Sequence, residues 1–161
     1  MHGALRQLSE AEADCVAAQM RLVVFHQGST LFHEGDDTRT GYLLLLLEGE
    51  VSVETAAGGH AAMPISALGA GSVIGEMALL DGSPRSATCI ALAPVRAAGL
   101  SRQGLDLLIE AQPKVAVKLL MSLGSHIAER LRAMSEQLQM VSRLHGDLQA
   151  ELKQRQGKAG H

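Results

Sequence analysis

Aromatic side chains are nearly missing from this sequence: they make up 2% of the 161 residues, and tryptophan is absent. Proteins that bind bases or sugars by stacking need aromatic faces, so this scarcity argues against such a platform. The core must instead be built from Leu, Val, Ala, Ile and Met. The hydrophobic share of 47% is ample for one compact domain with an appended element.

The sequence also lacks an excess of basic residues, since its formal net charge is −3 and its pI is about 6.1. Binding to nucleic acid or to anionic lipid depends on many phosphate-neutralising Lys and Arg residues, so we expect no direct DNA binding. Long hydrophobic runs are missing as well. The most apolar stretch, Tyr42–Leu47, is far shorter than the roughly 20 residues that span a bilayer, so we expect no membrane partner and interpret it as a buried strand.

Metal binding and nucleophilic catalysis are not indicated either. Cys15 and Cys89 lie far apart, and no secretion signal precedes them, which favours the reducing cytoplasm. The seven histidines form no His-x-His pair, and His26 and His33 have no third ligand in their surroundings, so we expect no metal. No Gly-x-Ser-x-Gly elbow occurs, and we do not expect an enzyme.

Short apolar or alternating runs, separated by Gly, Asp and Pro, fill the middle of the sequence. The predicted strands are Leu22–Phe25, Thr30–Phe32, Tyr42–Leu47, Val51–Thr55, Met63–Leu68, Ser72–Ile74, Ala87–Leu92 and Val95–Leu100. Seven or eight short strands at this spacing are typical of a barrel or a double-sheet jelly roll. We predict hairpin turns at Glu48-Gly49-Glu50 and at Gly58-Gly59, which gives a meander-like strand order.

A short helix is predicted before the strands, over Ser9–Met20. Ser9 is placed to cap it, with Glu12 three residues later, and Val16 belongs to its apolar edge. After the last strand the periodicity becomes helical again. Pro113 is placed to begin a long final helix in its first turn.

This final helix carries a heptad repeat with one polar member, over Ile127, Leu131, Met134, Leu138, Val141, His145, Leu148 and Leu152. Such a seam buries itself against another helix. At about 1.5 Å per residue it extends roughly 38 Å, longer than one face of a small barrel. We expect a parallel homodimeric coiled coil that weakens when His145 is protonated. In the alternative, the first half packs on the chain's own barrel and the tail after Leu144 frays, which Gly146 favours.

One segment, Gly75 to Thr88 with the sequence GEMALLDGSPRSAT, carries the candidate chemistry. Gly75 opens a short helical stretch and permits close backbone approach, so that amides of the first turn converge on an anion. Arg85 adds a planar cation that suits phosphate oxygens. Glu76 would repel an anion, which indicates another task, such as accepting hydrogen bonds from sugar hydroxyls.

The same segment closely resembles the phosphate-binding cassette of cyclic-nucleotide-binding domains. This family includes the bacterial catabolite activator, regulatory subunits of cAMP-dependent kinase and cyclic-nucleotide-gated channels. Gly28–Asp36 is similar to the family's early strand and loop, and Tyr42–Leu45 with Gly49 is similar to its next hairpin. The three motifs stand in the family's order, and the resemblance covers roughly Leu22 to Arg132. It implies an eight-stranded antiparallel jelly roll flanked by helices.

The resemblance also assigns roles within the pocket. It implies that Glu76, which follows the cassette Gly75, binds the ribose 2′-hydroxyl and that Arg85 pairs with the cyclic phosphate. The Ser86 hydroxyl is available to the phosphate or to the base. The implied ligand is cAMP or cGMP, with cAMP ahead on family frequency alone. Backbone amides complete the cradle around Met77, Ala78, Ser86 and Ala87.

The residue that contacts the base stays open between two places on the long helix. The pattern from Arg130 to Gln137 resembles the base-contacting turn of the catabolite activator and nominates Ser135. Counting without gaps from Pro113 points one turn earlier, to Arg130 and Leu131. In this family the helix often comes from the dimer partner, so the predicted dimer would close each pocket.

Together these features predict a cytoplasmic cyclic-nucleotide sensor in which ligand binding moves the C-terminal helices. Residues 1–112 are expected to form the jelly roll with its N-terminal helix, 113–155 the dimerisation helix and 156–161 a disordered tail. No kinase, channel or DNA-binding effector is visible, so we expect an unidentified effector protein or a missing fused domain to receive the signal. The alternative is a ligand-free jelly-roll dimerisation scaffold with a vestigial pocket.

Overall fold

The computed structural model describes residues 5, 7–56 and 63–158 of the chain. Helix α1 (Glu10–Ala17) precedes the strands, and helix α2 (Glu76–Asp81) lies between the sixth and the seventh. Helices α3 (Arg102–Ala111) and α4 (Pro113–Lys158) follow the strands. The strands are β1 (Met20–Phe25), β2 (Thr30–Phe32), β3 (Tyr42–Glu48), β4 (Glu50–Thr55), β5 (Met63–Gly69), β6 (Val73–Ile74), β7 (Thr88–Ala91) and β8 (Val95–Ser101).

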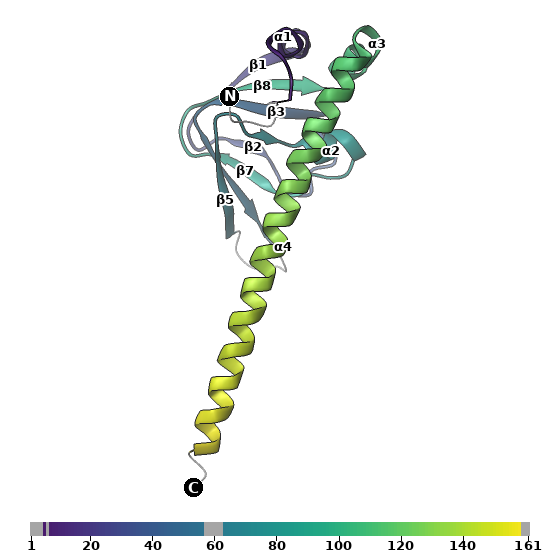
Figure 1. Ribbon diagram of the computed structural model, residues 1–161. Helices are drawn as coiled ribbons and strands as arrows, with labels where there is room; N and C mark the ends of the chain where they lie inside the picture. Colours follow the sequence, from purple (N-terminus) through teal and green to yellow (C-terminus); the bar gives the residue numbers. More distant parts are fainter. Residues whose placement is uncertain (1–4, 6, 57–62, 159–161) are drawn as a thin grey trace. The chain divides into compact units, whose positions relative to one another are not determined.

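The strands form two four-stranded sheets (Figure 1). Sheet A has the order β1-β8-β3-β6 and sheet B the order β2-β7-β4-β5, and the paired strands are antiparallel. Each of the eight predicted runs overlaps one of these strands. The predicted α+β fold, an eight-stranded jelly roll with an N-terminal helix and a long C-terminal helix, is confirmed.

The predicted meander order is wrong because the first predicted hairpin does not pair its strands. β3 and β4, on either side of Gly49, belong to different sheets. Gly49 has a φ of +89°, and a Cβ there would collide with the backbone of Pro94 and Val95. The chain therefore uses this glycine to cross from sheet A to sheet B past a neighbouring turn. The second predicted hairpin does join paired strands, β4 and β5, but its Gly58-Gly59 turn lies outside the described residues.

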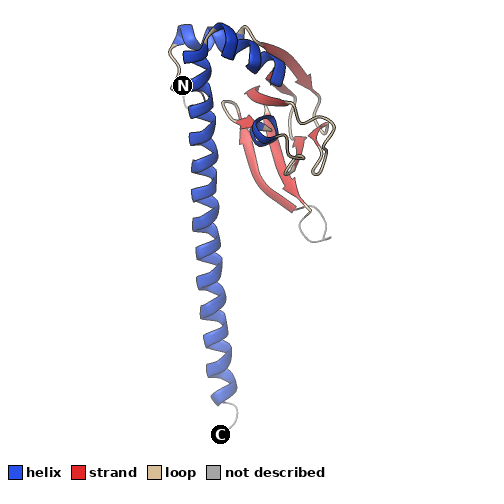
Figure 2. Ribbon diagram, turned by 90° about the vertical axis from the view of Figure 1, so that its right-hand side faces the viewer, coloured by secondary structure: helices blue, strands red, loops and turns tan. Residues whose placement is uncertain are grey.

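Two hydrophobic clusters cover the two faces of sheet A. The inner cluster, between the sheets, includes Phe32, Leu44, Leu46, Val51, Val53, Ile74 and Ala97. The outer cluster joins sheet A to α1, α3 and the first turns of α4, which lie on one side of the strands (Figure 2), and includes Val16, Leu43, Leu79, Leu100, Leu105, Leu119 and Leu123. Neighbouring residues of a strand point to opposite faces. β3 therefore needs apolar residues on both sides, which explains its unbroken run of leucines.

The capping box predicted at the start of α1 is present. The Ser9 hydroxyl accepts a hydrogen bond from the Glu12 N–H at 3.3 Å, and the Glu12 carboxylate accepts from the Ser9 N–H at 2.9 Å. Lys118 of α4 also donates to the Glu12 carboxylate, at 2.6 Å. This hydrogen bond is the main reason why the pKa of Glu12 lies below its usual range. The helix ends at Ala17, earlier than predicted, because Met20 already pairs in β1.

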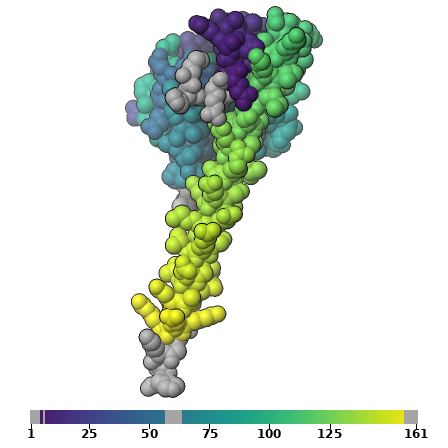
Figure 3. Space-filling view, viewed as in Figure 1, coloured from purple at the N-terminus to yellow at the C-terminus, as the bar shows by residue number. Residues whose placement is uncertain are grey.

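Helix α4 begins at Pro113, as predicted, and the chain divides within it into two compact units, Met1–Leu123 and Gly124–His161. The side chains of the second unit stand exposed along the helix (Figure 3), and more than half of the surface is exposed at Leu131, Met134, Leu138, Val141, Leu148 and Leu152. His145 Nε2 lies 2.9 Å from Gln149 Nε2. None of the described helices combines the length and the hydropathy that crossing a membrane requires.

Replacing Ser9 with Ala removes the hydroxyl that accepts from the Glu12 N–H. We expect this substitution to lower the free energy of unfolding by about 1 kcal/mol, the usual cost of losing an N-cap side chain. Urea denaturation followed by circular dichroism measures the change. Ser66→Ala, at an exposed position of β5, is the control and should stay within about 0.5 kcal/mol of the wild type. Equal stability of Ser9→Ala and the wild type would contradict the capping role.

Glu12 should make stability depend on pH. The pKa of Glu12 is lowered in the folded state. Its contribution to the free energy of unfolding is therefore present at pH values above the ordinary pKa of a glutamate, and it is lost as the pH falls through the pKa of the folded state. Glu12→Gln should therefore be less stable than the wild type at neutral pH, and the difference should vanish in acid. Thermal melts over this pH range measure it, and a difference that persists unchanged in acid would argue against an ionised Glu12 as its source.

Candidate functional site

Gly75 joins β6 to α2 and lies at the tightest point of the candidate site. It is the N-cap residue of α2, and its φ of +78° is one that residues with a side chain rarely adopt. A Cβ at this position would come within 2.5 Å of Arg85 Nη1 and 2.9 Å of the Phe32 ring. Glycine is therefore required here both by backbone conformation and by space.

Arg85 is buried, with 3% of its surface exposed, although it carries a charge. Its guanidinium donates to three backbone carbonyls. Nε and Nη2 donate to the Arg39 carbonyl at 3.1 and 2.5 Å, Nη2 also donates to the Tyr42 carbonyl at 2.9 Å, and Nη1 donates to the Gly75 carbonyl at 3.0 Å. These four hydrogen bonds occupy four of the five N–H donors of an arginine. The main chain thus replaces water around the buried cation.

Two neighbouring aromatic rings lie against the same guanidinium. Its central carbon lies 3.9 Å from the centroid of the Phe32 ring and 4.8 Å from that of Tyr42, and the two rings are 5.4 Å apart. A cation over aromatic faces is attracted by their quadrupoles. Burial lowers the pKa of the Arg85 guanidinium, while Tyr42, Asp36 and Glu76 act on the pKa in the opposite direction. The rings and the nearby acidic groups help to keep the charge in place.

Phe32, Tyr42 and the Arg39 carbonyl are parts of the site that the sequence reasoning missed. A carbonyl acceptor leaves no signal in a sequence, because every residue has one. The rings did have a signal. The chain contains two phenylalanines and one tyrosine, and two of these three residues, Phe32 and Tyr42, fall within the motifs that resemble the family.

The main chain of Arg85 is fixed by the loop that follows β2. The Arg85 N–H donates to the Asp36 carbonyl at 2.9 Å, and the Gly35 N–H donates to the Arg85 carbonyl at 2.8 Å. On the other side, the Ser83 N–H donates to the Asp81 carboxylate at 2.9 Å and closes the turn after α2. This turn and this loop together position Arg85 so that its guanidinium reaches the carbonyl of Gly75.

Glu76 is the first residue of α2 and is almost completely buried, with 2% of its surface exposed. A carboxylate is favoured there by the positive end of the helix dipole. Met77 is partly exposed, with 44% of its surface accessible, and Ala78 is buried. Their amides belong to the first turn of α2, where a helix supplies no acceptor of its own. The start of α2 therefore presents a carboxylate together with amide donors.

Of the predicted site residues, seven lie in the first compact unit: Gly75, Glu76, Met77, Ala78, Arg85, Ser86 and Ala87. Ser86 is exposed and Ala87 is half-buried. Ser135 lies in the second unit, where its hydroxyl donates to the Leu131 carbonyl at 3.0 Å. Its role as the base contact stays a prediction, and so does the alternative of Arg130 and Leu131.

The arrangement suits a ligand that carries both an anionic group and hydroxyls. The planar fork of Arg85 matches phosphate oxygens, and the Glu76 carboxylate is an acceptor for hydroxyl donors. Among the described residues, no three His, Cys, Asp or Glu side chains come together as metal ligands would.

Comparison with known proteins identifies the family. The family model described as the cyclic nucleotide-binding domain matches residues 22–112, which include the whole segment from Gly75 to Thr88. A cyclic AMP receptor protein of Thermus thermophilus is 30% identical over 135 residues, which are 84% of this chain and 60% of that protein. A cAMP-dependent protein kinase regulatory subunit of Aspergillus niger is 31% identical over 105 residues, which are 65% of this chain and 24% of that protein. The first relative is named as a receptor protein and the second as a regulatory subunit.

Solved structures agree with this family. The crystal structure of a cyclic nucleotide-binding domain from Methylobacillus flagellatus has a TM-score of 0.74 and 36% identity, and the match covers 78% of this chain and 70% of that one. The chain spans 60% of the length of the Thermus receptor and 24% of that of the Aspergillus subunit, so the match reaches only part of those proteins. The fold, the buried arginine and glutamate and these matches lead to one conclusion: the chain belongs to the family of cyclic nucleotide-binding domains.

Proposed function

We propose that this domain senses cAMP and passes ligand binding on to the helices that follow the strands. As a member of its family, the chain is a cyclic nucleotide-binding regulatory module, with relatives among receptor proteins and kinase regulatory subunits. The observation that carries the proposal is the pair of buried charged residues in the cassette, Arg85 and Glu76. A scaffold without a ligand would be stabilised at least as well by apolar residues at both positions. Their presence favours a ligand over the ligand-free scaffold.

Each charged residue has one task in this proposal. Arg85 donates to the oxygens of the cyclic phosphate, and Glu76 accepts a hydrogen bond from the ribose 2′-hydroxyl. The amides of the first turn of α2 and those after Arg85 complete the phosphate cradle, at Met77, Ala78, Ser86 and Ala87. A cGMP ligand would use the same contacts, because they involve only the ribose and the phosphate.

A phosphate bound to Arg85 would compete with main-chain carbonyls for the same N–H donors. The guanidinium is bonded to the carbonyls of Arg39, Tyr42 and Gly75. If phosphate oxygens take over some of these donors, the carbonyls lose their partners and must find others. Ligand binding is therefore expected to shift the start of β3 and the start of α2.

The outer cluster offers a route from α2 to the later helices. Leu79 of α2 is 1% exposed and packs in the same cluster as Leu105 of α3 and Leu119 of α4. Arg102, the first residue of α3, donates to the Leu79 carbonyl at 3.1 Å. A ligand moves these helices only if it binds one arrangement more tightly than the other. The receiver of this movement is an effector protein or a fused domain, and the setting is the cytoplasm.

Calorimetric titration with cAMP and with cGMP tests the nucleotide site. Loss of a buried, charge-assisted contact costs about 2 to 5 kcal/mol, so Arg85→Leu should weaken binding at least tenfold. Glu76→Gln keeps the shape of the side chain and should also weaken binding, because the ribose hydroxyl loses an ionised acceptor. Arg96→Leu is the matched control: Arg96 is a half-exposed arginine of β8 paired with Glu48, and its loss should leave affinity unchanged.

Arg85 also holds backbone carbonyls, so thermal melts must show that each variant is folded. Equal affinity in the wild type, Arg85→Leu and Glu76→Gln would refute both assigned roles. If the folded wild type bound neither nucleotide, the ligand-free scaffold would become the better account. The ratio of the two affinities decides between cAMP and cGMP.

The second unit forms a parallel homodimeric coiled coil in this proposal. The support is its exposed apolar seam, since heptad side chains of this kind bury themselves against another helix. A contiguous exposed apolar stripe is also rare on soluble monomers. The division between residues 1–112 and 113–155 and the disordered tail over residues 156–161 stay predictions.

Light scattering of the full chain at micromolar concentration measures this association. The wild type should show twice the 17.0 kDa mass of one chain. Leu138→Lys places a charge in the seam and should yield the monomer mass, whereas Gln139→Lys, at the neighbouring exposed position, should leave the dimer intact. A monomeric wild type would end the dimer proposal.

A further inference from the structure

The inner face of sheet A has a hollow where three successive inward-facing residues of β8 are small. Ala97, Gly99 and Ser101 alternate along this strand with residues that point outward. Gly99 lies opposite Arg21 of β1 and opposite Leu44 of β3. A Cβ at Gly99 would meet only ordinary contacts, with Leu44 Cδ2 at 3.4 Å as the nearest. A larger side chain at this position would therefore extend into the hollow.

A pocket of about 420 Å³ occupies this hollow. Its walls are Val23 and Phe25 of β1 and Tyr42 and Leu44 of β3. Small-molecule sites measure roughly 300 to 1,000 Å³ and are lined mainly by apolar and aromatic side chains with a few polar groups. No residue of the segment from Gly75 to Thr88 lines this pocket, so it is separate from the cassette.

The polar groups of the pocket are a cation and a hydroxyl. Arg21 is exposed at the pocket, and it forms no ion pair with any residue that the structure describes. The Ser101 hydroxyl accepts from the Gly104 N–H at 3.0 Å, which leaves its own proton available to a ligand. An arginine fork binds a carboxylate through two parallel hydrogen bonds. The charge and the geometry therefore favour a carboxylate over a neutral head group.

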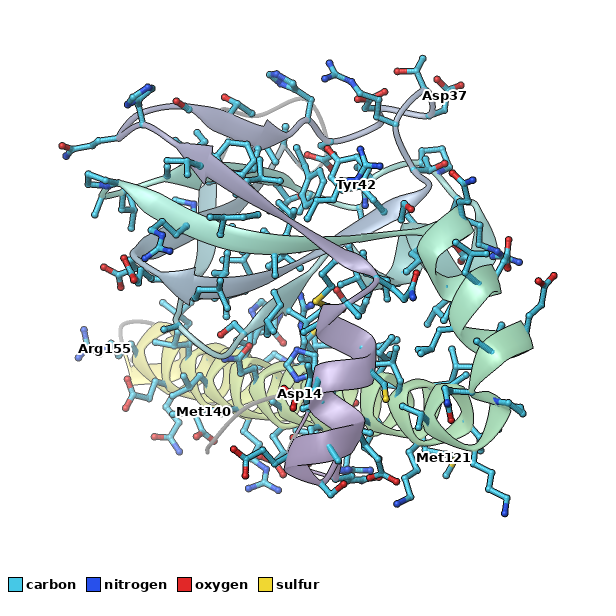
Figure 4. All side chains as sticks on the ribbon, turned by 90° about the horizontal axis from the view of Figure 1, so that it is seen from above. Asp14, Asp37, Tyr42, Met121, Met140 and Arg155 are labelled. Carbon is cyan, nitrogen blue, oxygen red and sulfur yellow. The ribbon has the colours of Figure 1, made fainter. Side chains whose placement is uncertain are left out.

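We propose that this pocket binds a small amphipathic carboxylate, such as a medium-chain alkyl carboxylate. The carboxylate lies at Arg21 and Ser101, and the alkyl chain lies over Gly99 between the side chains of Phe25 and Tyr42. The strand side chains around Tyr42 are drawn in Figure 4. This site shares Tyr42 with the surroundings of Arg85 but uses no cassette residue and takes a different ligand, and its test needs no nucleotide.

Tyr42 makes the binding directly visible. It is the chain's single tyrosine, and there is no tryptophan, so the intrinsic fluorescence of the protein comes largely from the wall of this pocket. Octanoate is the probe, because it stays monomeric at the concentrations needed. Titration of the nucleotide-free full chain with octanoate should change Tyr42 emission in a saturable way, and octan-1-ol should bind more weakly.

Variants at the floor and at the rim of the pocket test the location. Gly99→Val fills the hollow and should abolish the fluorescence response, whereas Ala98→Val adds similar volume to the opposite face of β8 and should preserve it. Arg21→Gln should weaken octanoate binding by up to about fivefold, the range for an exposed ion pair, and should leave octan-1-ol binding unchanged. Circular dichroism checks that each variant is folded. If Gly99→Val does not fold, the comparison of octanoate and octan-1-ol binding by Arg21→Gln tests the proposal.

Several outcomes would overturn the proposal. They are the absence of a saturable change in Tyr42 emission, equal affinity for octanoate and octan-1-ol, a response that survives in folded Gly99→Val, or an octanoate affinity that Arg21→Gln leaves unchanged. Calorimetry run in parallel separates this site from others. Octanoate heat that leaves Tyr42 emission unchanged would place the binding elsewhere, for example on the apolar seam of α4, and would also reject the pocket.

Discussion

The buried guanidinium of Arg85 ties together segments that are far apart in the sequence. Its donors reach the main chain at Arg39, Tyr42 and Gly75, and Phe32 covers one of its faces. A buried charge is tolerated only while its hydrogen bonds are made, so each of these segments must keep its place for the others to keep theirs. The positive φ of Gly75 belongs to the same arrangement, because a side chain there would displace the guanidinium.

A second arginine continues this pattern on the outer side of sheet A. Arg102 donates to the carbonyl of Leu79, as Arg85 donates to the carbonyl of Gly75 at the start of the same segment. Helix α2 is therefore held at one end by a residue of the cassette and at the other by the first residue of α3. Because a main-chain carbonyl accepts only along limited directions, a shift of α2 at Gly75 is not independent of its contact with α3. The short length of α2, Glu76–Asp81, makes this connection direct.

Much of this arrangement could be predicted from local sequence patterns. Eight strands, the capping box at Ser9 and the helix start at Pro113 each depend on residues within a few positions of one another. The assignment of strands to sheets could not be predicted, because Gly49 signals a turn but not whether that turn closes a hairpin or crosses between sheets. The identity of Arg85 as a candidate ligand contact came from the cassette pattern. Its carbonyl partners had no signal, since every residue offers the same acceptor.

The hollow on sheet A shows the other limit of sequence reasoning. Small residues at Ala97, Gly99 and Ser101 are visible in the sequence, but their meaning depends on which large residues stand across from them in β1 and β3. The periodicity of one strand shows which of its residues share a face. Only the register between strands shows whether neighbouring side chains fill the space over a glycine. For the same reason the heptad seam of α4 describes an apolar face and does not identify its partner.

Tyr42 belongs to both proposed sites, and this places a thermodynamic condition on them. Its ring and its carbonyl contact Arg85, and its side chain also lines the pocket. A carboxylate that changes the position of Tyr42 must also change the free energy of a nucleotide bound at Arg85. Binding free energies are linked, so the factor by which the carboxylate alters nucleotide affinity must equal the factor by which the nucleotide alters carboxylate affinity. Two ligands that share one side chain in this way cannot be independent unless Tyr42 keeps the same position and mobility in every complex.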